Sequence, residues 1–175
     1  RAGWHLSTPH RTGGTGGSGG SAAQAGGSVN SVAIGSSART DQSYGYSVAI
    51  GNNSKVGGGS TDGDGVAVGS NTEAYAYGVA IGSNAKSDQR GNAANTGTVA
   101  IGANSHVNNA DGGIAIGVYA KTGSFTHYAT AIGANAEATA VNTVALGVKS
   151  AASAENGIAI GAESISNSTR GVAIG

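Results

Sequence analysis

One tetrapeptide occurs ten times in this chain of 175 residues: an aliphatic residue (once Thr), Ala, an aliphatic residue and Gly. Successive copies end 13 to 20 residues apart, and 14 is the commonest spacing. A short repeat of this kind is typical of a solenoid, in which each repeat forms one coil stacked on the previous coil. The ten copies end at Gly35, Gly51, Gly69, Gly82, Gly102, Gly117, Gly133, Gly147, Gly161 and Gly175.

Each coil carries the alternation of a β-strand at two places. We number the coil positions from the first residue of the tetrapeptide, using Val144–Gly157 as the cleanest example. Positions one to three predict one strand, and positions seven to eleven predict a second. Gly at position four predicts a first turn, and Asn142, Asn156 and Gly157 predict a second turn at positions twelve to fourteen. The sequence therefore predicts an all-β fold, a parallel β-roll solenoid of about ten 14-residue coils.

The aliphatic residues at positions one and three are predicted to fill the roll. Small residues at positions seven and nine face them from the second strand, and the mostly charged or polar position eight faces water. The predicted roll core includes Val32, Ile34, Val48, Ile50, Val79, Ile81, Val99, Ile101, Val144, Leu146, Ile158 and Ile160.

The alanine at position two must then point away from the core, because alternate residues of a strand face opposite sides. Ala is a poor strand former, and an exposed face that never varies indicates close contact with another chain. We therefore predict an obligate homo-oligomer. Its predicted interface consists of Ala33, Ala49, Ala67, Ala80, Ala100, Ala115, Ala131, Ala145, Ala159 and Ala173.

The composition argues against a nucleic-acid partner, a membrane span and a disulfide framework. Nine basic and nine acidic residues give no basic face for a nucleic acid. No apolar run is long enough to span a membrane, and the absence of Cys excludes a disulfide framework. The chain begins with Arg1 and stops on a motif glycine, which we interpret as a segment of a longer protein.

The chain divides into two parts. Residues 1–27 are rich in Gly and contain Trp4, and they form either a flexible linker or a cap over the first coil. Residues 28–175 hold the repeats and form one domain.

Catalytic and metal chemistry find no support, so we expect no catalytic residues, no metal site and no cofactor. Nucleophile-elbow, zinc-protease and P-loop motifs are missing. Asp62 and Asp64 resemble a calcium loop only once, and His106 and His127 have no ligand-spaced carboxylate. A hexapeptide-repeat acyltransferase needs a six-residue period, which the spacing of about fourteen residues does not fit. An ice-binding solenoid needs a regular array of exposed Thr, whereas position eight holds mixed residue types.

The repeat resembles a known family. The unit Ser-Val-Ala-Ile-Gly-x-x-Ser/Ala, at Ser31–Ala38, Ser47–Ser54 and (with Gly first) Gly78–Ala85, is similar to the head repeat of YadA-like trimeric autotransporter adhesins. The resemblance covers residues 28–175. It implies a left-handed parallel β-roll in a homotrimer, displayed on the outer membrane at the bacterial cell surface. The neck, stalk and C-terminal membrane anchor of such proteins are not in this sequence.

The resemblance also implies a role in adhesion and virulence, through multivalent binding to host cells or to matrix proteins such as collagen, fibronectin or laminin. The alternative is a structural spacer with the ligand site elsewhere.

Irregular coils insert Gly57–Gly59, Asp62–Asp64 and Ser87–Thr96, and loops on a rigid scaffold often carry recognition residues. The candidate ligand surface, on the second strands, the long loops and nearby tyrosines, is Arg39, Lys55, Tyr75, Tyr77, Lys86, Asp88, Arg90, Asn92, Lys121 and Glu137.

Overall fold

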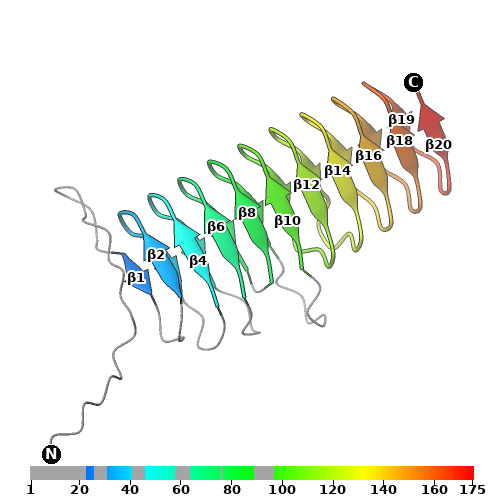
Figure 1. Cartoon of the computed structure of the whole chain (residues 1–175). Coiled ribbons are helices and arrows are strands. Elements are labelled where there is room, and N and C mark those ends of the chain that lie inside the picture. Colours follow the sequence, from blue (N-terminus) through cyan, green and yellow to red (C-terminus); the bar gives the residue numbers. More distant parts are fainter. Residues whose placement is uncertain (1–22, 26–30, 41–45, 58–63, 76, 89–96) are drawn as a thin grey trace, which may run out of the picture.

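The computed structural model describes residues 23–25, 31–40, 46–57, 64–75, 77–88 and 97–175. These residues form two parallel sheets of ten strands each, and the chain alternates between the sheets as it winds along the solenoid (Figure 1). The all-β solenoid is therefore confirmed. Within the described residues, no helix is long and apolar enough to cross a membrane.

We call the sheet built from the repeated motif the tetrapeptide sheet. Its strands occupy positions one to three of each coil, as predicted. They are β2 (Val32–Ile34), β4 (Val48–Ile50), β6 (Val66–Val68), β8 (Val79–Ile81), β10 (Val99–Ile101), β12 (Ile114–Ile116), β14 (Thr130–Ile132), β16 (Val144–Leu146), β18 (Ile158–Ile160) and β20 (Val172–Ile174).

We call the other sheet the short-strand sheet. Its strands are two residues long, shorter than the five positions that were predicted, and from β3 onward they occupy positions eight and nine. They are β1 (Gln24–Ala25), β3 (Arg39–Thr40), β5 (Lys55–Val56), β7 (Glu73–Ala74), β9 (Lys86–Ser87), β11 (His106–Val107), β13 (Lys121–Thr122), β15 (Glu137–Ala138), β17 (Ala151–Ala152) and β19 (Ile165–Ser166).

The coils stack in strict register, so each position lies on the same position of the next coil. Between β10 and β12, Ala100 pairs with Ala115 and Ile101 pairs with Ile116. The backbone ladder continues into the turns, where the Gly117 N–H donates to the Ile101 carbonyl at 2.7 Å. Backbone polar groups of each coil are thus satisfied by its neighbours.

The first turn of each coil is tight and needs glycine at position four. These glycines have φ between 116° and 139°, a region that side chains strongly disfavour. Position six has φ near 55° and is often Asn, which tolerates the left-handed conformation well. Where position seven is Ser or Thr, its hydroxyl donates back to the glycine carbonyl, as Ser105 does to Gly102 at 2.9 Å.

The second, wider turn is confirmed at the positions predicted for it. Asn142 and Asn156 have φ of 56° and 58°, and both lie one residue before the end of a coil. Tight turns therefore form one edge of the solenoid and wider turns the opposite edge (Figure 1).

The predicted direction of the tetrapeptide side chains is wrong. Ala33 is 1% exposed whereas Ile34 is 44% exposed, and the other coils follow the same pattern. Alanines therefore face the interior and the aliphatic residues face out. The two sheets lie too close for large side chains on both, so alanine fills the space from position two and position nine opposite it holds nothing larger than Val.

The corrected interior is built from alanine at position two, small residues at position seven and small or medium residues at position nine, where Val56 and Val107 are the largest. The alanines assigned to a partner interface are instead buried within their own chain, except for the half-buried Ala173: Ala33, Ala49, Ala67, Ala80, Ala100, Ala115, Ala131, Ala145, Ala159. The residues assigned to the roll core are instead half-buried or exposed on the outside: Val32, Ile34, Val48, Ile50, Val79, Ile81, Val99, Ile101, Val144, Leu146, Ile158, Ile160.

Candidate interaction surfaces

The outer face of the short-strand sheet carries a row of charged side chains. These residues stand at position eight, and the strand register places them next to one another: Arg39, Lys55, Glu73, Lys86, His106, Lys121 and Glu137. Position nine of the same strands is buried. The prediction that small residues face inward and charges face water on this strand is confirmed.

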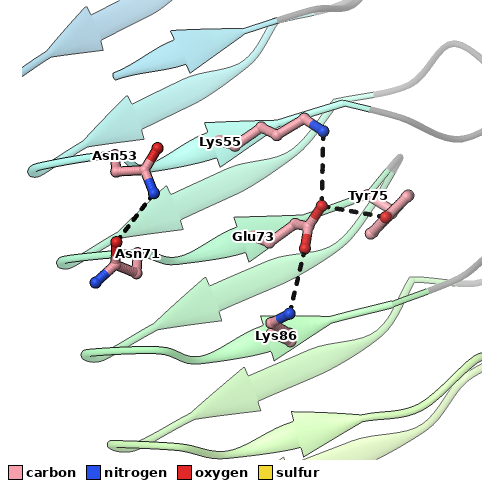
Figure 2. A network of polar contacts seen from close by, with 6 residues as sticks. All are labelled: Asn53, Lys55, Asn71, Glu73, Tyr75 and Lys86. Carbon is pink, nitrogen blue, oxygen red and sulfur yellow. Dashed lines mark hydrogen bonds and ion pairs between the residues drawn. The ribbon is translucent and has the colours of Figure 1, made fainter. Parts of the chain in front are cut away.

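Glu73 is the centre of a polar network on this face (Figure 2). Its carboxylate lies 3.6 Å from the ammonium groups of both Lys55 and Lys86, on the two neighbouring coils. The Tyr75 hydroxyl donates to Glu73 Oε1 at 3.1 Å. Further along, Lys121 and Glu137 form an ion pair at 2.9 Å. Neighbouring opposite charges thus fix the side chains in a mixed-charge row.

Asparagines extend this surface onto the tight-turn edge. Asn53 Nδ2 donates to Asn71 Oδ1 at 2.9 Å (Figure 2), and Asn84 Nδ2 donates to Asn104 Oδ1 at 3.2 Å. A shallow open depression on this surface is lined by Asn53, Asn71, Asn84, Lys55, Glu73 and Lys86. The outer face is therefore polar and able to form hydrogen bonds from Arg39 to Glu137, whereas Ala151 and Ile165 occupy the same position in the last two short strands.

The outer face of the tetrapeptide sheet has the opposite character. Each of its strands presents two outward side chains, at positions one and three, and all except Thr130 are Val, Ile or Leu. They stack in register from β2 to β20 and are half-buried or exposed. A single copy of the chain thus leaves an apolar face that runs the length of the solenoid. Exposed apolar patches of this extent mark interaction sites.

A comparison with family models identifies this arrangement. The model of the YadA head domain repeat (2 copies) matches residues 27–54, 93–120, 127–150 and 152–175, more than half of the chain. The chain belongs to the YadA head family. No match was found among curated proteins or among solved structures. YadA heads are parts of cell-surface autotransporter adhesins, so this chain is the head of an adhesin-type surface fibre, in a family that is in general non-enzymatic.

Most of the predicted ligand residues of this YadA head are at the surface. Arg39, Lys55, Lys86, Lys121 and Glu137 stand on the outer face of the short-strand sheet.

Tyr77 is exposed too, but it lies at the wide-turn edge. Tyr75 and Asp88 are buried, so their assignment to the ligand surface is wrong: both follow a short strand directly, and their backbone N–H groups donate to carbonyls of the next coil. Arg90 and Asn92 lie outside the described residues.

His127 has a carboxylate partner that sequence spacing does not reveal. Its Nδ1 lies 2.9 Å from Asp111 Oδ2, because the coil repeat places residues sixteen apart side by side. Within the described part of the chain, no group of three or more His, Cys, Asp or Glu side chains could hold a metal ion.

The aliphatic face is the surface that sequence reasoning missed. The sequence carries a signal for it, because Val, Ile or Leu fills positions one and three in every coil except at Thr130. The hydrogen-bonded asparagines of the tight-turn edge also have a sequence signal, because position six is Asn in five coils: Asn53, Asn71, Asn84, Asn104 and Asn135.

Proposed function

We propose that this YadA head works as a homotrimer, with the three tetrapeptide sheets facing one another and the three short-strand sheets facing out. In this arrangement the aliphatic faces form a shared apolar core between the chains. The outward charged rows attach the fibre to host cells or to matrix proteins such as collagen, fibronectin or laminin. The head is displayed above the bacterial outer membrane, to which other parts of the fibre are anchored.

The observation that carries the assembly is the aliphatic face itself. Burying a half-exposed Ile or Val recovers on the order of 1 kcal/mol, and some twenty such side chains line this face. The interior of one roll consists mainly of Ala, Ser and Thr with a few larger residues such as Val56 and Val107, so it buries little apolar surface per residue. Association supplies the apolar burial that a lone roll lacks. Family membership favours three copies over two.

The proposed ligand surface rests on the position of the charged row. Charges held by their neighbours on a stacked sheet present a rigid pattern, which reduces the entropy lost when a ligand binds. Three equal faces around one axis allow a fibrous ligand to contact several weak sites. Avidity then exceeds the affinity of one site by about 10² or more.

Two measurements test the proposal. Light scattering at micromolar concentration should give the mass of three chains, and a monomer with full β-structure would overturn the assembly. Solid-phase binding to collagen, fibronectin and laminin should then detect the ligand. The double substitution Lys86→Glu and Lys121→Glu should reduce binding to that ligand at least severalfold.

Lys149→Glu is the control for charge, to be compared with the single reversals Lys86→Glu and Lys121→Glu. Lys149 stands at the tight-turn edge, pairs with Glu163 at 3.2 Å and belongs to a coil beyond the charged row, which ends at Glu137. Its reversal should leave binding unchanged. A confirmed trimer that binds no matrix protein and no cell surface would overturn the adhesive role and leave the head a spacer. Equal loss in both charge variants would show a general charge effect and overturn the assigned surface.

A further inference from the structure

The two edges of the solenoid border the aliphatic face, and in a ring of parallel copies they meet. Rotation about an axis along the solenoid brings the tight-turn edge of one copy beside the wide-turn edge of the next. The same rotation keeps each coil at its own height. Any edge contact therefore joins a coil to the same coil of the neighbouring copy. Coil 114–129 is unusual on both of its edges.

On the tight-turn edge, this coil replaces small or polar residues with large apolar ones. Val118 and Tyr119 are both exposed, and Tyr119 is 56% exposed. Tyr119 has φ of 58°, the left-handed conformation that Asn adopts at this position in most other coils. Positions five and six of the preceding coils hold Ser36 and Ser37, Asn52 and Asn53, Ser70 and Asn71, Ser83 and Asn84, Ala103 and Asn104.

On the wide-turn edge, the same coil presents two aromatic side chains. Phe125 is 68% exposed and Tyr128 is 59% exposed. Both have left-handed backbones, with φ of 57° and 56°. This conformation is unfavourable for a bulky residue. Both side chains nevertheless keep most of their surface exposed in the single chain.

The wide turn is held firmly in place. Asn108 Nδ2 donates to Ser124 Oγ at 2.6 Å, and the Tyr128 N–H donates to the Asp111 carbonyl at 2.8 Å. The Asp111 carboxylate also pairs with His127. Tyr128 lies over Gly112, where an added Cβ would come within 2.9 Å of the ring. The two exposed rings are therefore presented from a fixed turn.

We propose that Val118 and Tyr119 of one copy pack against Phe125 and Tyr128 of the next copy, forming an aromatic clasp at this coil. The clasp rests on the proposed homotrimer and adds a specific contact to it. Both patches are apolar, stand at the same height and flank the same aliphatic face. Aromatic pairs stabilise a contact beyond the area that they bury. Three clasps around the axis also fix the register, because a shift by one coil places the rings against smaller residues.

Cysteine cross-linking tests the clasp directly, because the chain has no Cys. The double variant Tyr119→Cys with Tyr128→Cys, treated with a short bismaleimide, should run mainly as a covalent trimer on a denaturing gel. Each single variant should stay monomeric on that gel, since the contact joins two different edges. A mixture of the two single variants, co-expressed, should give covalent dimers.

The matched control places the second thiol at the same turn position but at another height. Arg170 has φ of 58° at the wide turn three coils further on, about 14 Å along the stack. Tyr119→Cys with Arg170→Cys should give little cross-linked product. A second pair, Val118→Cys with Phe125→Cys, should cross-link like the first. It keeps the test valid if one of the first two substitutions distorts its own turn.

The outcomes separate the clasp from the trimer. A chain that is trimeric by light scattering but cross-links in neither clasp pair overturns the clasp and leaves the trimer standing. Cross-linking by the Tyr119→Cys single variant indicates an isologous contact and also overturns the clasp. An unmodified chain that is monomeric at all concentrations overturns the trimer, and the clasp with it.

Discussion

Gly102 lies directly against Gly117 of the next coil: a Cβ added to Gly102 would stand 2.5 Å from the Gly117 carbonyl oxygen. The same contact recurs between successive tetrapeptide glycines along the solenoid. The obstructing atom is backbone, so it cannot rotate away as a side chain could. Glycine at position four is therefore required for two separate reasons: the close approach of the next coil and the positive φ of the backbone.

We predict that Gly102→Ala strongly destabilises the roll. Its φ of 125° alone costs Ala on the order of 1–3 kcal/mol, and the steric contact adds to that. Urea unfolding followed by circular dichroism measures the effect. The reverse change at the next residue, Ala103→Gly, should cost less than about 1 kcal/mol. Equal stability of Gly102→Ala and the unmodified chain would contradict the stacking argument.

A second prediction concerns the thin interior. Ala115 is fully buried between Ala100 and Ala131, so Ala115→Val forces extra methyl groups into a packed space. We expect a loss of about 1–3 kcal/mol in the free energy of unfolding. Ala134→Val is the control, because Ala134 is half-buried and the same position is Val at the exposed Val118 and Val148. If both substitutions cost the same, the interior has room that the structure does not indicate.

Strand positions and stacking could be predicted from the repeat, because the period defines the coil and alternation defines the faces. The side facing inward could not be predicted by alternation alone. Ala33 and Ile34 point to opposite sides in either orientation, and a single-chain argument places the larger residue inside. The distance between the two sheets decides which of these side chains faces inward, and the tight turn at Gly35 sets that distance.

The outward orientation of position eight could be predicted for a different reason. Lys55 and Lys86 cannot be buried without a large desolvation cost, so their strand has only one possible orientation. Tyr75 and Asp88 have no such constraint: the Tyr75 hydroxyl donates to Glu73 of its own coil, and the Asp88 N–H donates to the Val107 carbonyl of the next coil. Their burial depends on contacts between residues in different coils, which one coil's pattern does not contain.

A third prediction addresses the aliphatic face. Ile116 faces out from the tetrapeptide sheet and stacks on Ile132, so Ile116→Asp puts a charge into the proposed interface. Around a threefold axis, three carboxylates would be brought close together, and their repulsion and desolvation oppose assembly. We expect the mass measured by light scattering at micromolar concentration to fall from trimer towards monomer.

The control for this prediction is Lys121→Asp, which places the same side chain on the opposite sheet. It removes the ion pair with Glu137 but should leave the mass unchanged. A trimer that persists undiminished in Ile116→Asp would show that the copies associate through another face.

The last prediction concerns the Glu73 network. Glu73→Gln removes the charge that two lysines share but keeps the length of the side chain and an acceptor for the Tyr75 hydroxyl. Because both lysines remain partly in water, the loss of stability should be less than about 1 kcal/mol. Raising the salt concentration to 1 M should shrink the difference, since the screening length falls to about 3 Å. Denaturant unfolding at low and high salt measures both effects, and a loss well above 1 kcal/mol that salt does not change would show that the network contributes to the packing of the roll.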